Sequence, residues 1–410
     1  MGQVSLKVSP ADIASQEPSL EAASAELDKV LAKLTEEFAE RAAVHDRAAS
    51  FPFENIARLH ELRLLALTVP VELGGGLPAA FGGGEASLGL AAKVVRAVAA
   101  GDPSTALVLV MQYIFQLMIA QNEAWPAGLR LRVNTEAVQS GALINALRVE
   151  PDLGTPARGG LPATIARRTS DGWRLSGHKL YSTGAPALTW YAVWGRSDEP
   201  EPRVGTFLVH RDMPGIKIVE TWDHLGMRAS GSHDIIFEDV PIPADHAVDI
   251  RAPEAWASGF TPSELAWASV LIGSLYDGVA HSARDWFVKF ANNRKPSNLG
   301  APLSSLPRFQ EGAGFIDALL FTNGVLLQQA ADAADRQTYP PARDSNFIKY
   351  IVTKNAIEAV ERAIELCGNP GLTRANPLER HYRDVLCSRI HTPQNDVILA
   401  SAGRSVLAAP

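Results

Sequence analysis

The segment His391-Thr392-Pro393-Gln394 places an imidazole, a hydroxyl and an amide side by side near the C-terminus. It follows the charged run Glu379–Asp384, which is typical of a helix. Because Pro393 has no amide hydrogen and pushes its predecessor out of the α region, that helix is expected to end near Ile390 or His391. Residues 392–396 can then cap a final helix that runs through 397–400. Such an elbow suits a few side chains held against a ligand, and it equally suits a plain turn between helices.

The composition is that of an ordinary soluble protein with enough apolar residues for a large core. Of 410 residues, 46% are hydrophobic and 20% are charged, and this length allows two or three domains. The formal charge of −7 argues against a nucleic-acid partner. Cys367 and Cys387 form no CxxC pair, and the ten histidines show no metal-ligand spacing. The sequence therefore predicts neither a disulfide scaffold nor a metal site.

No segment is expected to direct the chain into or across a membrane. The N-terminal residues lack a basic stretch followed by an apolar one. The most apolar run, residues 106–120, contains Gln112 and Gln116 and is too short to cross a bilayer. We expect a buried helix there and a cytoplasmic protein.

The pattern of residues divides the chain into three structured blocks after a loose arm over residues 1–18. Residues 19–137 are predicted to be helical, and the period changes near residue 140. Residues 138–251 hold short β-branched and aromatic runs separated by turns, which predict a small sandwich or barrel. Residues 252–410 return to helices, expected over 263–292, 306–336 and 347–367. The fold class is α+β, and this order is more typical of a composite enzyme than of a binding module.

Four motifs in this order resemble the acyl-CoA dehydrogenase superfamily over about residues 20–405. They resemble, in turn, the loop that lines flavin and substrate, the strand laid against the flavin ring, and two stretches of the last β segment. The motifs are Val149-Glu-Pro-Asp-Leu-Gly-Thr155, Lys179-Leu-Tyr-Ser-Thr-Gly-Ala185, Leu225-Gly-Met-Arg-Ala-Ser-Gly-Ser232 and Phe237-Glu-Asp-Val-Pro-Ile-Pro243. The resemblance implies N-terminal helices, a central β domain, a C-terminal four-helix bundle and a flavin. It also implies that the flavin-contacting residues include Val149, Tyr181, Ser182, Thr183 and Gln394.

The resemblance leaves the chemistry open at the elbow. Most dehydrogenases of the family carry a Glu after a Tyr there, and that carboxylate removes the α-proton of a thioester. The matching places hold His391 and Thr392, and a threonine hydroxyl is far too weak a base for this step. Some relatives place the Glu on the first long C-terminal helix, where Glu264 lies within one residue of the matching place. Glu264 is alternatively an acid favoured by the dipole at a helix N-terminus.

The elbow resembles more closely the flavin-dependent monooxygenase branch of the family, typified by dibenzothiophene monooxygenase. Such enzymes take reduced flavin from a separate reductase and form a C4a-hydroperoxide with O2. Asn145, Thr183 and His391 match the residues that crowd the reactive flavin edge in that branch, and they are the catalytic candidates. The structural alternatives are that His391 caps a helix, Asn145 satisfies a strand end and Thr183 bonds only the flavin ring.

The residues expected to bind the nucleotide tail depart from the dehydrogenase pattern. The run Arg294-Lys-Pro-Ser-Asn-Leu-Gly-Ala-Pro-Leu303 keeps the family's Gly-x-Pro-Leu but lacks the Gln-Phe before it, and its Arg is displaced. Arg294 is therefore a phosphate candidate, and reduced FMN is as plausible a cofactor as reduced FAD. The resemblance also implies a homotetramer formed through the C-terminal bundle.

The preferred interpretation is a two-component flavin-dependent monooxygenase that oxygenates a small organic substrate. The first rival is an FAD-dependent acyl-CoA dehydrogenase with Glu264 as the base. The second rival is a flavin-free scaffold that keeps the fold. The sequence leaves open which substrate is used and whether carbon, nitrogen or sulfur is oxygenated.

Overall fold

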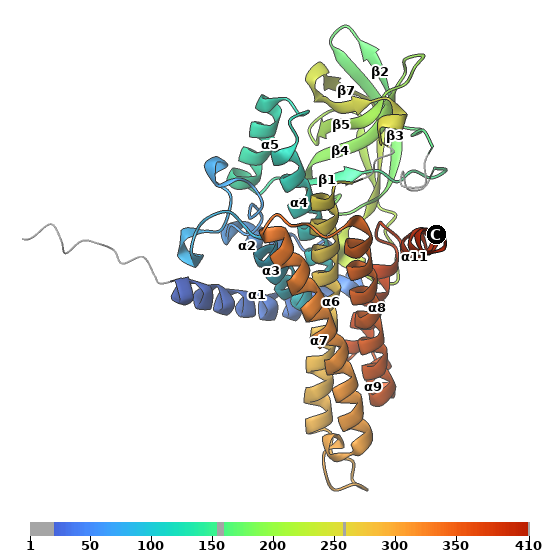
Figure 1. Ribbon diagram of the computed structural model, residues 1–410. Helices are drawn as coiled ribbons and strands as arrows, with labels where there is room; N and C mark the ends of the chain where they lie inside the picture. Colours follow the sequence, from blue (N-terminus) through green and yellow to red (C-terminus); the bar gives the residue numbers. More distant parts are fainter. Residues whose placement is uncertain (1–19, 154–159, 257–259, 409–410) are drawn as a thin grey trace, which may run out of the picture.

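The computed structural model describes residues 20–153, 160–256 and 260–408. The arm predicted over residues 1–18, and part of the motif that begins at Val149, lie outside the described residues. The chain forms N-terminal helices, a central sheet and a C-terminal helical domain in that order (Figure 1). The predicted α+β architecture of three blocks is thus confirmed.

The N-terminal helices pack tightly on one another and on the sheet. Thr35 of α1 donates a hydrogen bond to the carbonyl of Ala97 in α3, at 2.8 Å. Gly101 closes α3 so near to α1 that a Cβ atom would lie 2.6 Å from the carbonyl oxygen of Thr35. These helices are α1 Leu20–Ala48, α2 Phe53–Glu61, α3 Leu88–Gly101, α4 Pro103–Gln121 and α5 Ala127–Ser140.

Helix α4 is the core helix of this part. Asp102 caps its N-terminus by accepting hydrogen bonds from the amide of Ser104 and the hydroxyl of Thr105, at 3.2 and 2.6 Å. By length and composition α4 could cross a membrane, but 67% of its apolar window is buried inside the protein. The buried helix expected over residues 106–120 is therefore present.

The central strands form one continuous sheet of eight strands. The order is β6-β7-β3-β2-β4-β5-β8, and β1 pairs with β4 in parallel. Nearly every position of β4 is buried, so both faces of the sheet are covered there, whereas the buried positions of β7 recur every two or three residues. The strands are β1 Leu143–Leu147, β2 Ile165–Thr169, β3 Gly172–Ser182, β4 Leu188–Ser197, β5 Val204–His210, β6 Ile216–Val219, β7 His233–Pro243 and β8 Ala247–Arg251.

The C-terminal domain is built on three long helices that extend away from the sheet (Figure 1). Thr261 and Glu264 cap the first of them reciprocally, and Pro262 starts it. Gly273 allows close packing, because a Cβ there would lie 2.8 Å from Leu327 and 3.4 Å from Val352. The helices are α6 Pro262–Asn293, α7 Pro307–Asp335, α8 Ala342–Cys367, α9 Asn369–Leu372, α10 Leu378–Leu386 and α11 Asn395–Leu407.

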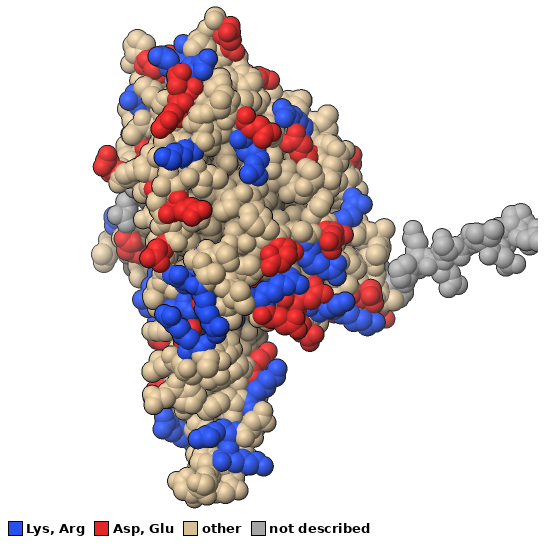
Figure 2. Space-filling model, turned by 180° about the vertical axis from the view of Figure 1, so that it is seen from behind, with Lys and Arg blue, Asp and Glu red and all other residues tan. Residues whose placement is uncertain are grey.

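Buried polar contacts fix α10, and with it the elbow, to the other two parts. Asp384 accepts a hydrogen bond from the amide of Met227, at 2.7 Å, in the segment before β7. Arg383 pairs with Asp46 at the end of α1, at 2.7 Å. All three parts therefore meet beside the elbow. On the outside, acidic and basic side chains are scattered over the same face (Figure 2).

Candidate functional site

The elbow at residues 391–394 is tied to the long helices α6 and α8. Helix α10 ends at Leu386, a 3-10 turn covers Cys387–Arg389, and α11 begins at Asn395. The α-helix therefore ends four residues before Ile390, the earlier of the two expected end points. Its last turn continues as the tighter 3-10 turn up to Arg389. The ring of His391 contacts the hydroxyl of Tyr276 in α6, with 2.5 Å between Nε2 and the oxygen.

Lys349 of α8 holds the main chain of the same elbow. Its Nζ donates hydrogen bonds to the carbonyl oxygens of His391 and Pro393, at 3.2 and 3.1 Å. A third bond reaches the side-chain oxygen of Asn395, at 3.2 Å. Lys349 is only 1% exposed. The main chain of the elbow is therefore fixed by hydrogen bonds from a buried side chain, and it is not a loose turn between two helices.

These contacts define a neutral imidazole. Burial, and then the positive charge of Lys349, lower the pKa of His391 to about 3. Burial lowers the pKa of Lys349 to about 8 and raises the pKa of Tyr276 well above its usual value. At neutral pH, His391 can thus exchange hydrogen bonds with a ligand but carries no charge of its own.

We expect the ring of His391 to stay neutral between pH 5 and 8. Its pKa is lower in the folded than in the unfolded protein, so the unfolded chain binds more protons between about pH 3 and 6.5. This group alone should therefore reduce stability as the pH falls through that window, by about 1.4 kcal/mol per pH unit. Nuclear magnetic resonance of ¹⁵N-histidine-labelled protein should show flat His391 shifts from pH 8 to pH 5. An inflection near pH 6.5 would contradict this environment.

A second group of predicted residues meets where β3 ends. The amide of Asn145, which is 4% exposed, donates to the carbonyl oxygen of Thr183 at 3.0 Å. The hydroxyl of Thr183 lies 3.0 Å from that of Ser232, which contacts Ser230 at 2.7 Å. The buried hydroxyl of Ser182 has no partner within the described protein. The structure thus places two of the three catalytic candidates, Asn145 and Thr183, in direct contact.

Tyr181 presents an aromatic face beside these hydroxyls. It lies in the left-handed region, with φ of 55°, and is 52% exposed. With Trp222 and His224, which stack at 3.7 Å, it walls a hollow of about 250 Å³ that also includes Ser232. The carbonyl of Val149 accepts from the amide of Leu180, at 2.9 Å, which fixes this strand end. An exposed ring beside the paired hydroxyls of Thr183 and Ser232 fits a planar, polar-edged group such as a flavin.

Two predicted cofactor residues lie apart from this strand end. Arg294 is exposed at the C-terminal end of α6, and eighteen residues separate it from Tyr276, about 27 Å along the helix axis. Arg294 therefore lies far from Tyr276, and its predicted phosphate role stays a prediction. Gln394 forms the N-cap residue of α11. No hydrogen bond in the described part of the chain joins His391 to Asn145 or Thr183.

Glu264, the base of the rival dehydrogenase interpretation, is engaged at the start of α6. Its carboxylate accepts hydrogen bonds from the amide and the hydroxyl of Thr261, at 2.7 and 3.0 Å. Twelve residues separate it from Tyr276, which is about 18 Å along the helix. Its observed contacts are those of a helix cap.

The sequence did not identify Tyr276 or Lys349 as site residues, although the position of Lys349 in an apolar stripe was a signal. It lies in a buried stripe of α8 that continues through Val352, Ala356 and Val360, where the helical period calls for apolar residues. A lysine in such a stripe is unusual, because lysine side chains are rarely buried unless they have a polar partner. Tyr276 gave no such signal, since a tyrosine in an apolar helix is ordinary.

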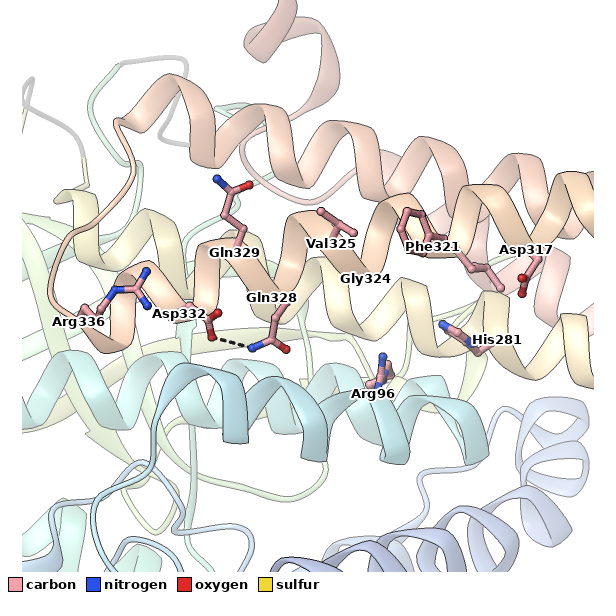
Figure 3. A pocket seen from close by; sticks show the side chains of 11 residues that line it. Arg96, His281, Asp317, Phe321, Gly324, Val325, Gln328, Gln329, Asp332 and Arg336 are labelled. Atoms are coloured by element: carbon pink, nitrogen blue, oxygen red, sulfur yellow. Dashed lines mark hydrogen bonds between the residues drawn. The ribbon is translucent and has the colours of Figure 1, made fainter.

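A larger hollow, of about 680 Å³, lies on the outer face of α7 and is bordered by Arg96 of α3 and His281 of α6 (Figure 3). None of the predicted site residues lines it. Phe321 and Val325 of α7 are 73% and 49% exposed there. Within the described residues, no cluster of His, Cys, Asp or Glu could hold a metal ion.

Fold, strand-end hydroxyls and elbow together define a protein of the acyl-CoA dehydrogenase class. The acyl-CoA dehydrogenase N-terminal, middle and C-terminal domain models match residues 21–122, 148–240 and 260–407. The chain is 32% identical to a protein of Bacillus subtilis (strain 168) that is named "Putative acyl-CoA dehydrogenase YdbM", over 90% of this chain and 93% of that protein. The chain therefore belongs to the acyl-CoA dehydrogenase family.

Other relatives carry different names. L-evernosamine nitrososynthase of a Micromonospora strain is 29% identical over 90% of this chain and 86% of that protein. KijD3 in complex with FMN and a dTDP-linked amino sugar is 29% identical, with a TM-score of 0.79 and coverage of 94% of both chains. TdsC from Paenibacillus sp. A11-2, solved with FMN and indole, shares the fold at 18% identity, covering 93% of this chain and 97% of that one, with a TM-score of 0.80.

Proposed function

We propose that this protein is a flavin-dependent monooxygenase. The observation that carries the proposal is the built elbow, where a neutral His391 stands between Tyr276 and Lys349 and its observed contacts include no carboxylate. Removal of an α-proton beside a thioester requires a base. At pH 7 this imidazole is uncharged but too weakly basic for that step, and the hydroxyl of Thr392 is weaker still.

Reduced FMN or FAD would supply two electrons to O2, so that one oxygen atom enters the substrate and the other leaves as water. Tyr181 would face the ring, and the hydroxyls of Ser182 and Thr183 would bind its polar edge. Asn145 orients the carbonyl of Thr183. His391 would hydrogen-bond the reacting oxygen without adding a competing charge. The reduced flavin would come from a separate reductase.

The nitrososynthase and the FMN-bound KijD3 complex support this proposal at 29% identity across nearly the whole chain. Both names concern amino sugars, so a small amine is the first substrate class to try. YdbM, at 32% identity, supports the dehydrogenase alternative instead. Two observations favour the monooxygenase: no carboxylate is among the observed contacts of His391, and the carboxylate of Glu264 is bonded to Thr261 at the start of α6.

The proposal is tested by mixing the protein with anaerobically reduced FMN or FAD and then adding O2 with a panel of small amines and thioethers. We expect an oxygenated product that carries ¹⁸O from labelled O2, and slower release of hydrogen peroxide than from free reduced flavin. Binding of neither flavin would favour a flavin-free scaffold. Flavin binding with no protection and no labelled product would also reject the monooxygenase.

Replacement Glu264→Gln should leave oxygenation unchanged and lower stability by less than about 1 kcal/mol, because the glutamine keeps most of the capping contact. The dehydrogenase alternative makes the opposite prediction: acyl-CoA esters would reduce bound FAD, and this replacement would abolish the reduction. Anaerobic titration of the oxidised protein with short and medium acyl-CoA esters, followed by flavin absorbance, separates the two. Glu254→Gln, in the 3-10 turn before α6, is the matched control.

We also propose a homotetramer in which the α7 face that carries Phe321 and Val325 packs against another copy. A phenylalanine that is 73% exposed beside an exposed valine is an unusual surface for an isolated chain. Sedimentation velocity of Phe321→Arg, compared with Lys354→Arg, tests this assignment. A species of unchanged size would contradict it.

A further inference from the structure

We propose that Lys349 is a positioning residue for His391, because its ammonium group fastens the main chain of the elbow and so holds the imidazole against Tyr276. The assignment deepens the proposed function, and its catalytic consequence rests on that function. Its structural part can be tested independently of any reaction.

Each of the three N–H groups of the Lys349 ammonium has one acceptor. An ammonium has three N–H groups and accepts no hydrogen bond. Its three partners are the carbonyl oxygens of His391 and Pro393 and the side-chain oxygen of Asn395, all within 3.1–3.2 Å. One side chain from α8 thus binds both sides of the Thr392–Pro393 peptide and the start of α11.

In the described part of the chain, main-chain hydrogen bonds hold the elbow only at its two ends. The last main-chain hydrogen bond before it runs from the amide of Ile390 to Cys387, and the next one after it runs from Ile398 to Gln394. Among the described residues, no main-chain hydrogen bond involves residues 391–393. The two carbonyl oxygens of this stretch that have partners are therefore held by Lys349.

Lys349 binds the elbow without a counter-ion among the described residues. In the described part of the chain no carboxylate lies within ion-pair distance of its Nζ, although the side chain is 1% exposed. A buried ammonium neutralised only by carbonyl and amide dipoles is an unfavourable choice for packing alone. An apolar residue of similar volume would fill the stripe of α8 more favourably, so the cation serves the elbow.

Tyr276 of α6 is the second residue that holds His391, and it contacts the ring itself. Tyr276 is fully buried and its hydroxyl lies 2.5 Å from Nε2. Lys349 grips the main chain, while Tyr276 fixes the direction of the ring. Because the ammonium and the imidazole share one buried region, the charge of Lys349 also opposes protonation of His391.

The test compares three flavin-loaded variants. Lys349→Met has a similar length but no donors, Lys354→Met makes the same change at an exposed position five residues further along α8, and Tyr276→Phe removes only the ring anchor. Hydrogen–deuterium exchange of peptides covering residues 387–398 reports the elbow. We expect about tenfold faster exchange in Lys349→Met, and wild-type exchange in the other two.

The reaction gives the second readout. We expect oxygenated product per reduced flavin to fall about tenfold in both Lys349→Met and Tyr276→Phe, with a matching rise in hydrogen peroxide. Flavin affinity and the far-ultraviolet spectrum should stay unchanged. If Lys349→Met fails to fold, Asn395→Ala removes one acceptor without burying an unpaired charge, and it should show intermediate exchange.

The two failures are distinguishable. Wild-type elbow exchange in Lys349→Met, or in Asn395→Ala where the first variant does not fold, would overturn the positioning role even if the wild-type protein oxygenates a substrate. Absence of oxygenation by the wild-type protein would overturn the proposed function, while faster elbow exchange in the variant would still support Lys349 as the fastener. Faster exchange with unchanged product yield in an active enzyme would reject the catalytic consequence.

Discussion

Replacement of His391 by alanine is expected to lower substrate oxygenation by about 10²–10³-fold, while oxygen is still consumed. His391 is held at two points, because Tyr276 contacts its ring at Nε2 and Lys349 binds its main-chain carbonyl. Without it, the reacting oxygen loses a fixed hydrogen-bond partner and water gains access. Reduced flavin should then yield hydrogen peroxide in place of product.

The measurement is the ratio of oxygenated product to hydrogen peroxide for each reduced flavin oxidised. Arg389→Ala is the matched control, since Arg389 is exposed two residues before His391. It should behave as wild type. His391→Ala that oxygenates substrate at the wild-type rate would remove the observation on which the proposed function stands, whatever the fold.

The helices were predictable because their signals are local. Thr261, Pro262 and Glu264 mark the start of α6 within four residues, and Pro307 starts α7. The final helix was expected over 397–400 but runs over Asn395–Leu407, because nothing after Ala400 interrupts it until the C-terminal end. The beginning of a helix can be missed as well: α8 was expected over 347–367, and it begins at Ala342 but ends at Cys367 as expected.

The candidate site was predictable only in part. The resemblance placed Asn145 and Thr183 together, and the structure joins them directly. Lys349 and Tyr276, which hold His391, lie 42 and 115 residues away in sequence. Neither helical periodicity nor a capping motif relates positions that far apart. A lysine in an apolar stripe shows that something polar must be near, but only the packing of α8 against the elbow shows what it is.

The largest expected loss of stability comes from a buried ion pair that involves Lys179 of β3. Lys179 and Glu150 are 0% and 1% exposed and lie 2.6 Å apart. Glu150 also accepts from the amides of Ala163 and Thr164, at 2.6 and 2.9 Å. Burial lowers the pKa of Lys179 to about 8, against the opposing pull of Glu150. The pair therefore joins β3 to the chain that follows β1 and leads into β2.

Replacement Lys179→Met should lower the free energy of unfolding by about 3–5 kcal/mol, because it leaves a buried carboxylate without its counter-ion. The double variant Lys179→Met, Glu150→Gln should recover part of this loss, because no buried charge remains and the single side-chain oxygen of the glutamine can still accept from one of the two amides. Urea unfolding of flavin-free protein measures both, and Lys217→Met on exposed β6 should stay within about 0.5 kcal/mol of wild type. Equal losses in the single and double variants would show that the lysine acts through packing. Recovery in the double variant would show that the penalty is electrostatic, and that the pair holds in place the strand end that carries Tyr181 and Thr183.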